Sequence, residues 1–174
     1  GYQTAYNSTD AYYVTAIGKD ALKVNTVYYG TAVGCFALDA NTTGAQNTAV
    51  GFQSLSANTT GQNNVVMGVN ALVANTTGGS NTVIGHNALS TNTTSSSNTA
   101  IGASALNSGT AEENTAIGQN ASYELTTGYH QTAVGFSSGR TVTTGIGGVY
   151  LGRSALASGT NPSYEIVIGS NSTG

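Results

Sequence analysis

Hydrophobic and polar positions recur along this chain with one short period from end to end. A large aliphatic residue followed by glycine returns every 16 or 17 residues. A small residue and usually a threonine precede that pair, and Ala or Ser and then usually Leu follow three and four places later. Self-similarity at a short fixed period indicates a solenoid or a repeat array. The anchoring glycines of the repeat, called anchors below, are Gly18, Gly34, Gly51, Gly68, Gly85, Gly102, Gly118, Gly135, Gly152 and Gly169.

Each repeat has the features of one coil of β-structure. The Thr-Ala-Ile type of run before the anchor suits a strand. Several repeats close with Asn-Thr-Thr-Gly, at 41–44, 58–61 and 75–78, and these residues favour turns. We expect two short strands and two turns per repeat, which is too short a period for a helical hairpin. The pattern predicts an all-β fold, a parallel β-solenoid of about ten to eleven coils that forms a single domain over residues 1–174.

The strand pattern also predicts a partner for this solenoid. Neighbouring strand residues point to opposite faces, yet both residues of Val83-Ile84 are apolar. We expect the smaller residue to fill the lumen and the larger one to be covered by identical chains, most simply in a homotrimer. The alternative is a monomer with both columns inside a wider lumen. The larger residues form a column of core or trimer-interface candidates: Ile17, Val33, Val50, Met67, Ile84, Ile101, Ile117, Val134, Leu151 and Ile168.

Composition narrows the classes of partner. Charged residues make up 6% of the chain, far below the roughly 25% typical of soluble domains. The basic residues are Lys19, Lys23, Arg140 and Arg153, too few and too scattered to neutralise a run of nucleic-acid phosphates. No apolar run is long enough to span a membrane. Gly1 falls in the register of the anchors, so we expect this chain to be a fragment of a longer fibrous protein.

A search for catalytic or metal-binding residues yields no site. His86 and His130 lie more than two coils apart without clustered carboxylates, so we expect no metal and no other cofactor. Asp20 and Asp39 stand at different distances from their anchors, which argues against a catalytic carboxylate pair. Cys35 is the sole cysteine and occupies a variable position, so it forms no disulfide within the chain. The sequence therefore predicts a protein that is not an enzyme.

Three further features stay open at this stage. The doublet Glu112-Glu113 replaces the usual polar turn, and we expect it to be solvated. The first coils and later turns are rich in tyrosine, which suits either a contact surface or cover for coil ends. Seven Asn-x-Ser/Thr sequons occur, and turn geometry already explains the repeated ones; they begin at Asn7, Asn41, Asn58, Asn75, Asn92, Asn120 and Asn171.

The repeat units resemble those of a known class of fibrous proteins. NTAVGFQSLSANTTGQN at 47–63, NTVIGHNALSTNTTSSS at 81–97 and NTAIGASALNSGTAEE at 98–113 are similar to repeat arrays of bacteriophage tail fibres. They also resemble the head repeats of trimeric autotransporter adhesins. The resemblance implies a homotrimeric extracellular rod on the virion that contacts a carbohydrate or protein receptor on the host cell, with the bacterial cell surface as the alternative location. It does not identify the receptor-contact residues.

Departures from the repeat affect two of these expectations. Gly139 and Ser122 stand where Leu is expected, and Tyr150 stands where a small residue is expected, so the last third fits the family pattern less well and is where we expect the rod to change thickness. An ice-binding solenoid is a third functional hypothesis, because threonines stack in columns at the strands. Val65, Val149 and Ile166 interrupt that column, so this hypothesis ranks below the fibre and the adhesin.

Overall fold

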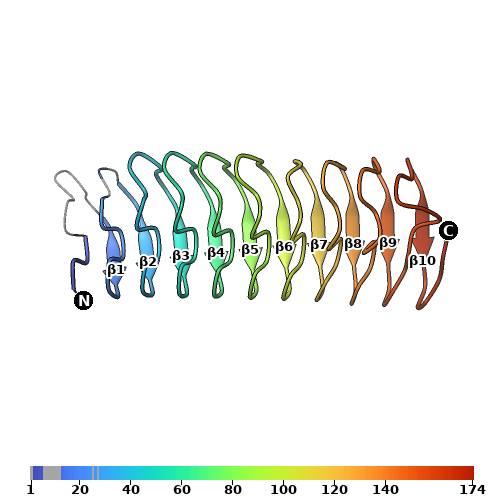
Figure 1. Ribbon diagram of the computed structural model, residues 1–174, viewed down its shortest axis with the longest axis horizontal. Helices are drawn as coiled ribbons and strands as arrows, with labels where there is room; N and C mark the ends of the chain where they lie inside the picture. The colour runs from blue at the N-terminus through green and yellow to red at the C-terminus, as the bar shows by residue number, and fades with distance from the viewer. Residues whose placement is uncertain (1, 6–12, 25, 27) are drawn as a thin grey trace.

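The protein is a rod of stacked coils with its two ends far apart (Figure 1). The computed structural model describes residues 2–5, 13–24, 26 and 28–174, and within these it contains no helix. Ten strands of three residues lie side by side in one parallel sheet, each paired with the next strand of the chain. They are β1 (Thr15–Ile17), β2 (Thr31–Val33), β3 (Thr48–Val50), β4 (Val65–Met67), β5 (Thr82–Ile84), β6 (Thr99–Ile101), β7 (Thr115–Ile117), β8 (Thr132–Val134), β9 (Val149–Leu151) and β10 (Ile166–Ile168).

This arrangement confirms the predicted all-β parallel solenoid. The ten strands bound about nine turns of about 17 residues, slightly fewer than the ten to eleven coils expected. The register is exact from coil to coil, as in the pairs Ala32 with Ala49 and Val50 with Met67. At about 4.8 Å between paired strands, β1 and β10 lie about 43 Å apart. Residues one repeat apart therefore form columns along the rod.

The prediction of a second strand in each coil is wrong. The residues two and four places after each anchor mostly adopt a left-handed backbone, as do Asn70 (φ 54°) and Leu72 (φ 50°), and this alternation makes a compact turn. Six leucines share this conformation: Leu22, Leu38, Leu55, Leu72, Leu89 and Leu106. A left-handed residue costs about 1–2 kcal/mol. Burying a leucine contributes about 1.5–3 kcal/mol, which offsets that cost.

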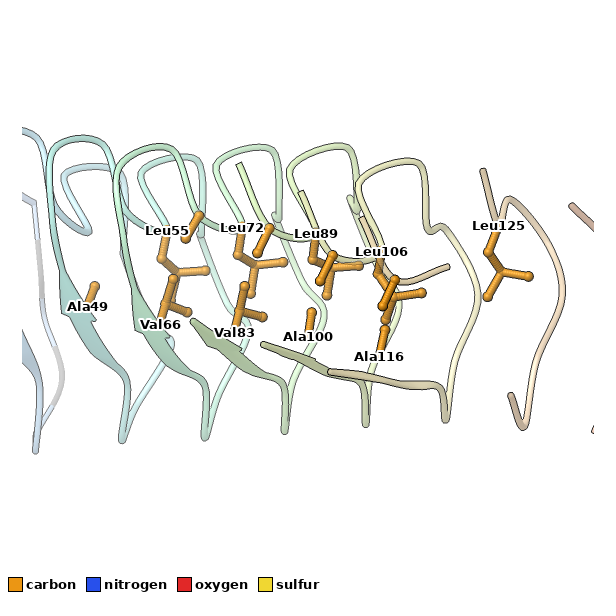
Figure 2. Close-up of a cluster of buried hydrophobic side chains, with 14 of the residues drawn as sticks. Ala49, Leu55, Val66, Leu72, Val83, Leu89, Ala100, Leu106, Ala116 and Leu125 are labelled. Carbon is orange, nitrogen blue, oxygen red and sulfur yellow. The ribbon is translucent and has the colours of Figure 1, made fainter. Parts of the chain in front are cut away.

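The lumen is filled by one small and one large apolar column. Figure 2 shows the middle residue of each strand, such as Val66 or Ala100, opposite the leucine of the turn, such as Leu72. These side chains are fully buried, and so is the residue that precedes each turn leucine, which is alanine except for Ser54 before Leu55. The close fit leaves room only for Ala or Val in the strand column of the regular coils.

Two ladders of buried asparagine flank this apolar core. In the first, the side-chain amide of Asn58 donates to the side-chain oxygen of Asn41 (2.8 Å), and Asn75 and Asn92 continue the row. In the second, Asn64 donates its backbone N–H to the side-chain oxygen of Asn47 (2.9 Å). Asn81, Asn98, Asn114 and Gln131 extend this second ladder. Buried amides are costly unless they are paired, so each ladder fixes the register of successive coils.

The last third departs from the regular repeat in its packing as well as in its sequence. Tyr150 is fully buried in the lumen, in the column that holds Ala or Val elsewhere. It occupies the space left by Gly139, because a β-carbon added at Gly139 would lie 2.9 Å from the tyrosine ring. Leu125 and Val142 stand in the first asparagine column and are also fully buried. Large and small residues have thus exchanged positions between neighbouring coils.

Candidate interaction surface

The outward face of the sheet carries two parallel columns along the rod. Because side chains alternate across each strand, the residues on either side of the buried middle one point outward. The first outward residue is threonine in seven strands and Val65, Val149 or Ile166 in the other three. The second is the large aliphatic residue before the anchor. The outward face is therefore half polar and half apolar along its length.

The aliphatic column does not lie in the lumen. Its exposed fraction ranges from 37% at Val134 to 68% at Ile168 among the members that are exposed in the single chain. The exposed members are Ile17, Met67, Ile117, Val134 and Ile168, and the half-buried ones are Val33, Val50, Ile84, Ile101 and Leu151. The alternative of a wider lumen holding both columns is therefore wrong. A continuous apolar stripe remains uncovered on one chain.

The anchors hold the coils at close distance beside this stripe. All ten have a positive φ, between 123° and 141°. At Gly51, an added β-carbon would lie 2.5 Å from the carbonyl oxygen of Gly68 in the next coil. Only glycine fits such a backbone and such a contact.

The residue after the anchor is variable, and in two coils it adds an aromatic ring beside the stripe. Phe52 and Phe136 are each nearly half exposed. Phe52 packs edge-on against Phe36, with ring centroids 6.2 Å apart, and the ammonium of Lys19 lies 5.1 Å from the Phe36 ring centre. Cys35, in the same column, is a half-buried free thiol.

Exposed tyrosines gather at the N-terminal end of the rod. The rings of Tyr13 and Tyr29 stack in parallel with centroids 5.4 Å apart, and Tyr28 packs at a tilt against Tyr29. Tyr2 is 71% exposed. Tyr6, Tyr12 and the sequon at Asn7 lie outside the described residues. This patch is aromatic and solvent-accessible, as a contact surface requires.

Asp20, near the N-terminus, forms two ion pairs. Asp20 is almost fully buried, and its carboxylate faces the ammonium groups of Lys23 at 3.5 Å and Lys19 at 3.8 Å. Burial raises the pKa of the Asp39 carboxyl, and the negative charge of Asp20 raises it further. The two aspartates do not share a column, but they lie close enough to interact. A group of three or more metal-ligating side chains is absent from the described part of the chain.

The structure places one carboxylate beside His130, a contact that the sequence did not lead us to expect. The ring nitrogen Nε2 of His130 lies 2.5 Å from a carboxylate oxygen of Glu113, one coil away. Sequence alone could have found this pair, because the two residues are 17 positions apart and so share a column. His86 is exposed, and the doublet Glu112-Glu113 is exposed as expected.

The repeated sequons are closed to modification in the folded rod. Asn41, Asn58, Asn75 and Asn92 are at most 1% exposed because they form the first asparagine ladder. Asn120 is half-buried and Asn171 is exposed.

Two further findings concern membrane spans and likeness to known families and structures. No helix in the described ranges combines the length and apolar character needed to cross a membrane. No protein-family model, curated protein or solved structure matches the chain.

Proposed function

We propose that this chain is a structural and attachment segment of a trimeric bacteriophage tail fibre. The observation that supports this function best is the uncovered aliphatic column, which runs in register along the whole sheet. Three parallel chains that turn this column toward a common axis would bury it. Fully burying an exposed side chain of this kind contributes about 1.5–3 kcal/mol, and a half-buried one contributes less, so the column as a whole provides a driving force for assembly.

The interior suits a stiff spacer. Backbone hydrogen bonds join each coil to the next, and the asparagine ladders add buried side-chain bonds with the same spacing. Each coil packs on its neighbours in sequence, as is typical of solenoids. A rod of this kind transmits force and holds a receptor-binding surface away from its base. The exposed tyrosine patch and the rings beside the stripe are the candidate contacts with a host-cell carbohydrate or protein.

Ice binding remains a second candidate because of one observation. A threonine column runs unbroken along the turns at residues 42, 59, 76, 93, 110, 126, 143 and 160. Several of these hydroxyls donate to the carbonyl oxygen of the next coil, for example Thr42 to Thr59 at 2.9 Å. Because this bonding orders the hydroxyls, the column could template water. Thermal hysteresis of the purified chain would support this candidate, and its absence would exclude it.

The oligomeric state tests the fibre proposal directly. We expect light scattering after size exclusion to give three times the mass of the chain at micromolar concentration. Ile101→Asp should yield a folded monomer, because Ile101 is half-buried in one chain and would be fully buried in the trimer. Thr77→Asp, an exposed turn position, is the matched control and should stay trimeric. A monomeric parent chain, or a trimer that tolerates Ile101→Asp, would overturn the proposed interface.

A trimer supports a phage fibre and a bacterial adhesin head equally. The neighbourhood of the gene separates the two. Adjacent baseplate or capsid genes support the fibre, whereas a membrane anchor encoded downstream in the same reading frame contradicts it.

A further inference from the structure

One concave site lies on the turns of two neighbouring coils. It encloses about 300 Å³ and is lined by Ala111, Glu112, Glu113, Tyr129 and His130. This volume is at the lower end for small-molecule sites and suits one sugar ring or the end of one long side chain. None of these residues belongs to the sheet face that the proposed trimer would cover.

A shortened coil creates this concavity. The interval from Gly102 to Gly118 is 16 residues, one fewer than in the coils on either side. The residue that is missing corresponds to the buried glycine of the regular turn, such as Gly78 or Gly128. Below the gap, the hydroxyl of Ser95 donates to the carbonyl oxygen of Thr110 in the shortened coil. The concavity thus lies between the turn of the shortened coil, at residues 111–113, and the turn of the next coil, at residues 129–130.

The charges of the site favour a cation. The Glu113 carboxylate pairs with His130, and each of these side chains is more than half exposed. Glu112 is exposed and has no ion-pair partner among the residues that the structure describes. The nearest basic residue along the chain, Arg140, is directed to Glu124 at 3.9 Å and to the Tyr123 ring. Whether or not His130 is protonated, the site keeps a negative charge.

An aromatic ring completes the site. Tyr129 is 41% exposed and is fixed by an edge-on contact with the His130 ring, with centroids 4.9 Å apart and planes at 82°. Its ring therefore has a defined orientation and an accessible surface beside two carboxylates. A carboxylate together with an aromatic face is the combination that recognises an organic cation.

We propose that this concavity binds a protonated primary amine carried on a short apolar stem or a sugar ring. Glu112 and Glu113 contact the ammonium group, and the Tyr129 ring packs against the adjoining carbons. Two sources share this chemistry, an amino sugar and a lysine side chain. The site lies within one chain, so it does not depend on the proposed trimer.

Titration of the ¹⁵N-labelled chain, observed by NMR, tests the site. Glucosamine and Nα-acetyl-lysine amide are the two probes, and N-acetylglucosamine is the neutral control with the same ring. We expect at least one amine to shift the amide signals of residues 111–113 and 129–130, with a Kd of about 1–10 mM. Binding of glucosamine alone identifies the amino sugar, and binding of the lysine derivative alone identifies a peptide. No shift with either amine, or equal shifts with N-acetylglucosamine, would overturn the proposal.

Three variants localise the contact. Glu112→Gln removes the unpaired charge with little change in shape and should weaken amine binding at least tenfold. Tyr129→Leu should weaken it by a similar factor. Glu124→Gln changes a half-buried carboxylate outside the site and should leave the affinity unchanged. Because all three positions are solvent-accessible, we expect each variant to fold, and melting curves check this. Equal affinities in all three variants would place the binding site elsewhere.

Discussion

Substitution of a single anchor, Gly68→Ala, tests the stacking of the coils. Gly68 has a φ of 140°, and an added β-carbon would lie 2.5 Å from the carbonyl oxygen of Gly85. Such a backbone costs a non-glycine residue about 1–3 kcal/mol. Relieving the clash also separates the coils and stretches bonds such as Gly85 N–H to Met67 oxygen, now 2.8 Å. Loss of one or two such bonds adds about 1–2 kcal/mol.

We therefore expect Gly68→Ala to lower the free energy of unfolding by about 2–5 kcal/mol. For a chain of this size, each kcal/mol corresponds to about 2–4 °C in Tm, so the melting temperature should fall by about 4–20 °C. The matched control is Gly159→Ala, since an added β-carbon there meets nothing within 4 Å. Far-ultraviolet circular dichroism follows the thermal unfolding of both variants. An unchanged Gly68→Ala curve, or an equal loss in Gly159→Ala, would refute close contact between anchors.

Three further outcomes follow from the interior. Asn64→Ala should cost about 2–4 kcal/mol because it leaves the Asn81 N–H without its side-chain acceptor, whereas the exposed Gln62→Ala should be neutral in urea unfolding. Tyr150→Ala should cost about 3–5 kcal/mol, and adding Gly139→Leu should recover part of the loss in a double-mutant cycle. Burial raises the pKa of the Tyr150 hydroxyl, and the nearby Glu165 carboxylate raises it further. Because the folded state therefore favours the protonated hydroxyl, the stabilisation that Tyr150 provides is complete below pH 10 and falls as the pH rises above it. Tyr150→Phe should reduce this alkaline loss in Tm measured against pH.

The periodic part of the fold could be predicted from the sequence because the columns repeat many times. A strand residue such as Ala49 has equivalents in every coil, so chance substitutions do not hide its inward position. The alternation along Thr48-Ala49-Val50 also separates the outward from the inward column. The recurrence of equivalent residues and the alternation along each strand are both visible in the sequence, and together they predict the coil and which side chains face its lumen.

The turn after each anchor could not be predicted in the same way. Leucine rarely adopts a left-handed backbone, so local preference gives no sign that Leu72 does. Burial against the strand column overrides that preference, and burial depends on the closed coil. The exchange between Gly139 and Tyr150 is hidden for a related reason, because the two residues belong to successive coils and each looks like a defect by itself.

The concave site combines a predictable and an unpredictable part. Glu113 and His130 share a column, so their proximity follows from the 17-residue spacing once the coil is accepted. The concavity beside them lies at a coil that is one residue shorter. The sequence could not predict it, because the packing of neighbouring residues decides whether a shortened turn leaves a concavity. The orientation of Tyr129 over this concavity is likewise set by contact with His130.

The strict stacking of the strands has a consequence for how such chains change over evolution. Each strand contacts only the strands before and after it, and equivalent backbone atoms recur at every period. Excision of one whole unit, such as residues 52–68, rejoins chemically equivalent positions and leaves the remaining packing intact. Unequal crossing-over between near-identical units would thus lengthen or shorten the molecule in increments of about 4.8 Å. The length of the rod can therefore change in whole units without any new kind of contact, while its stability rises or falls with the number of coil-to-coil interfaces.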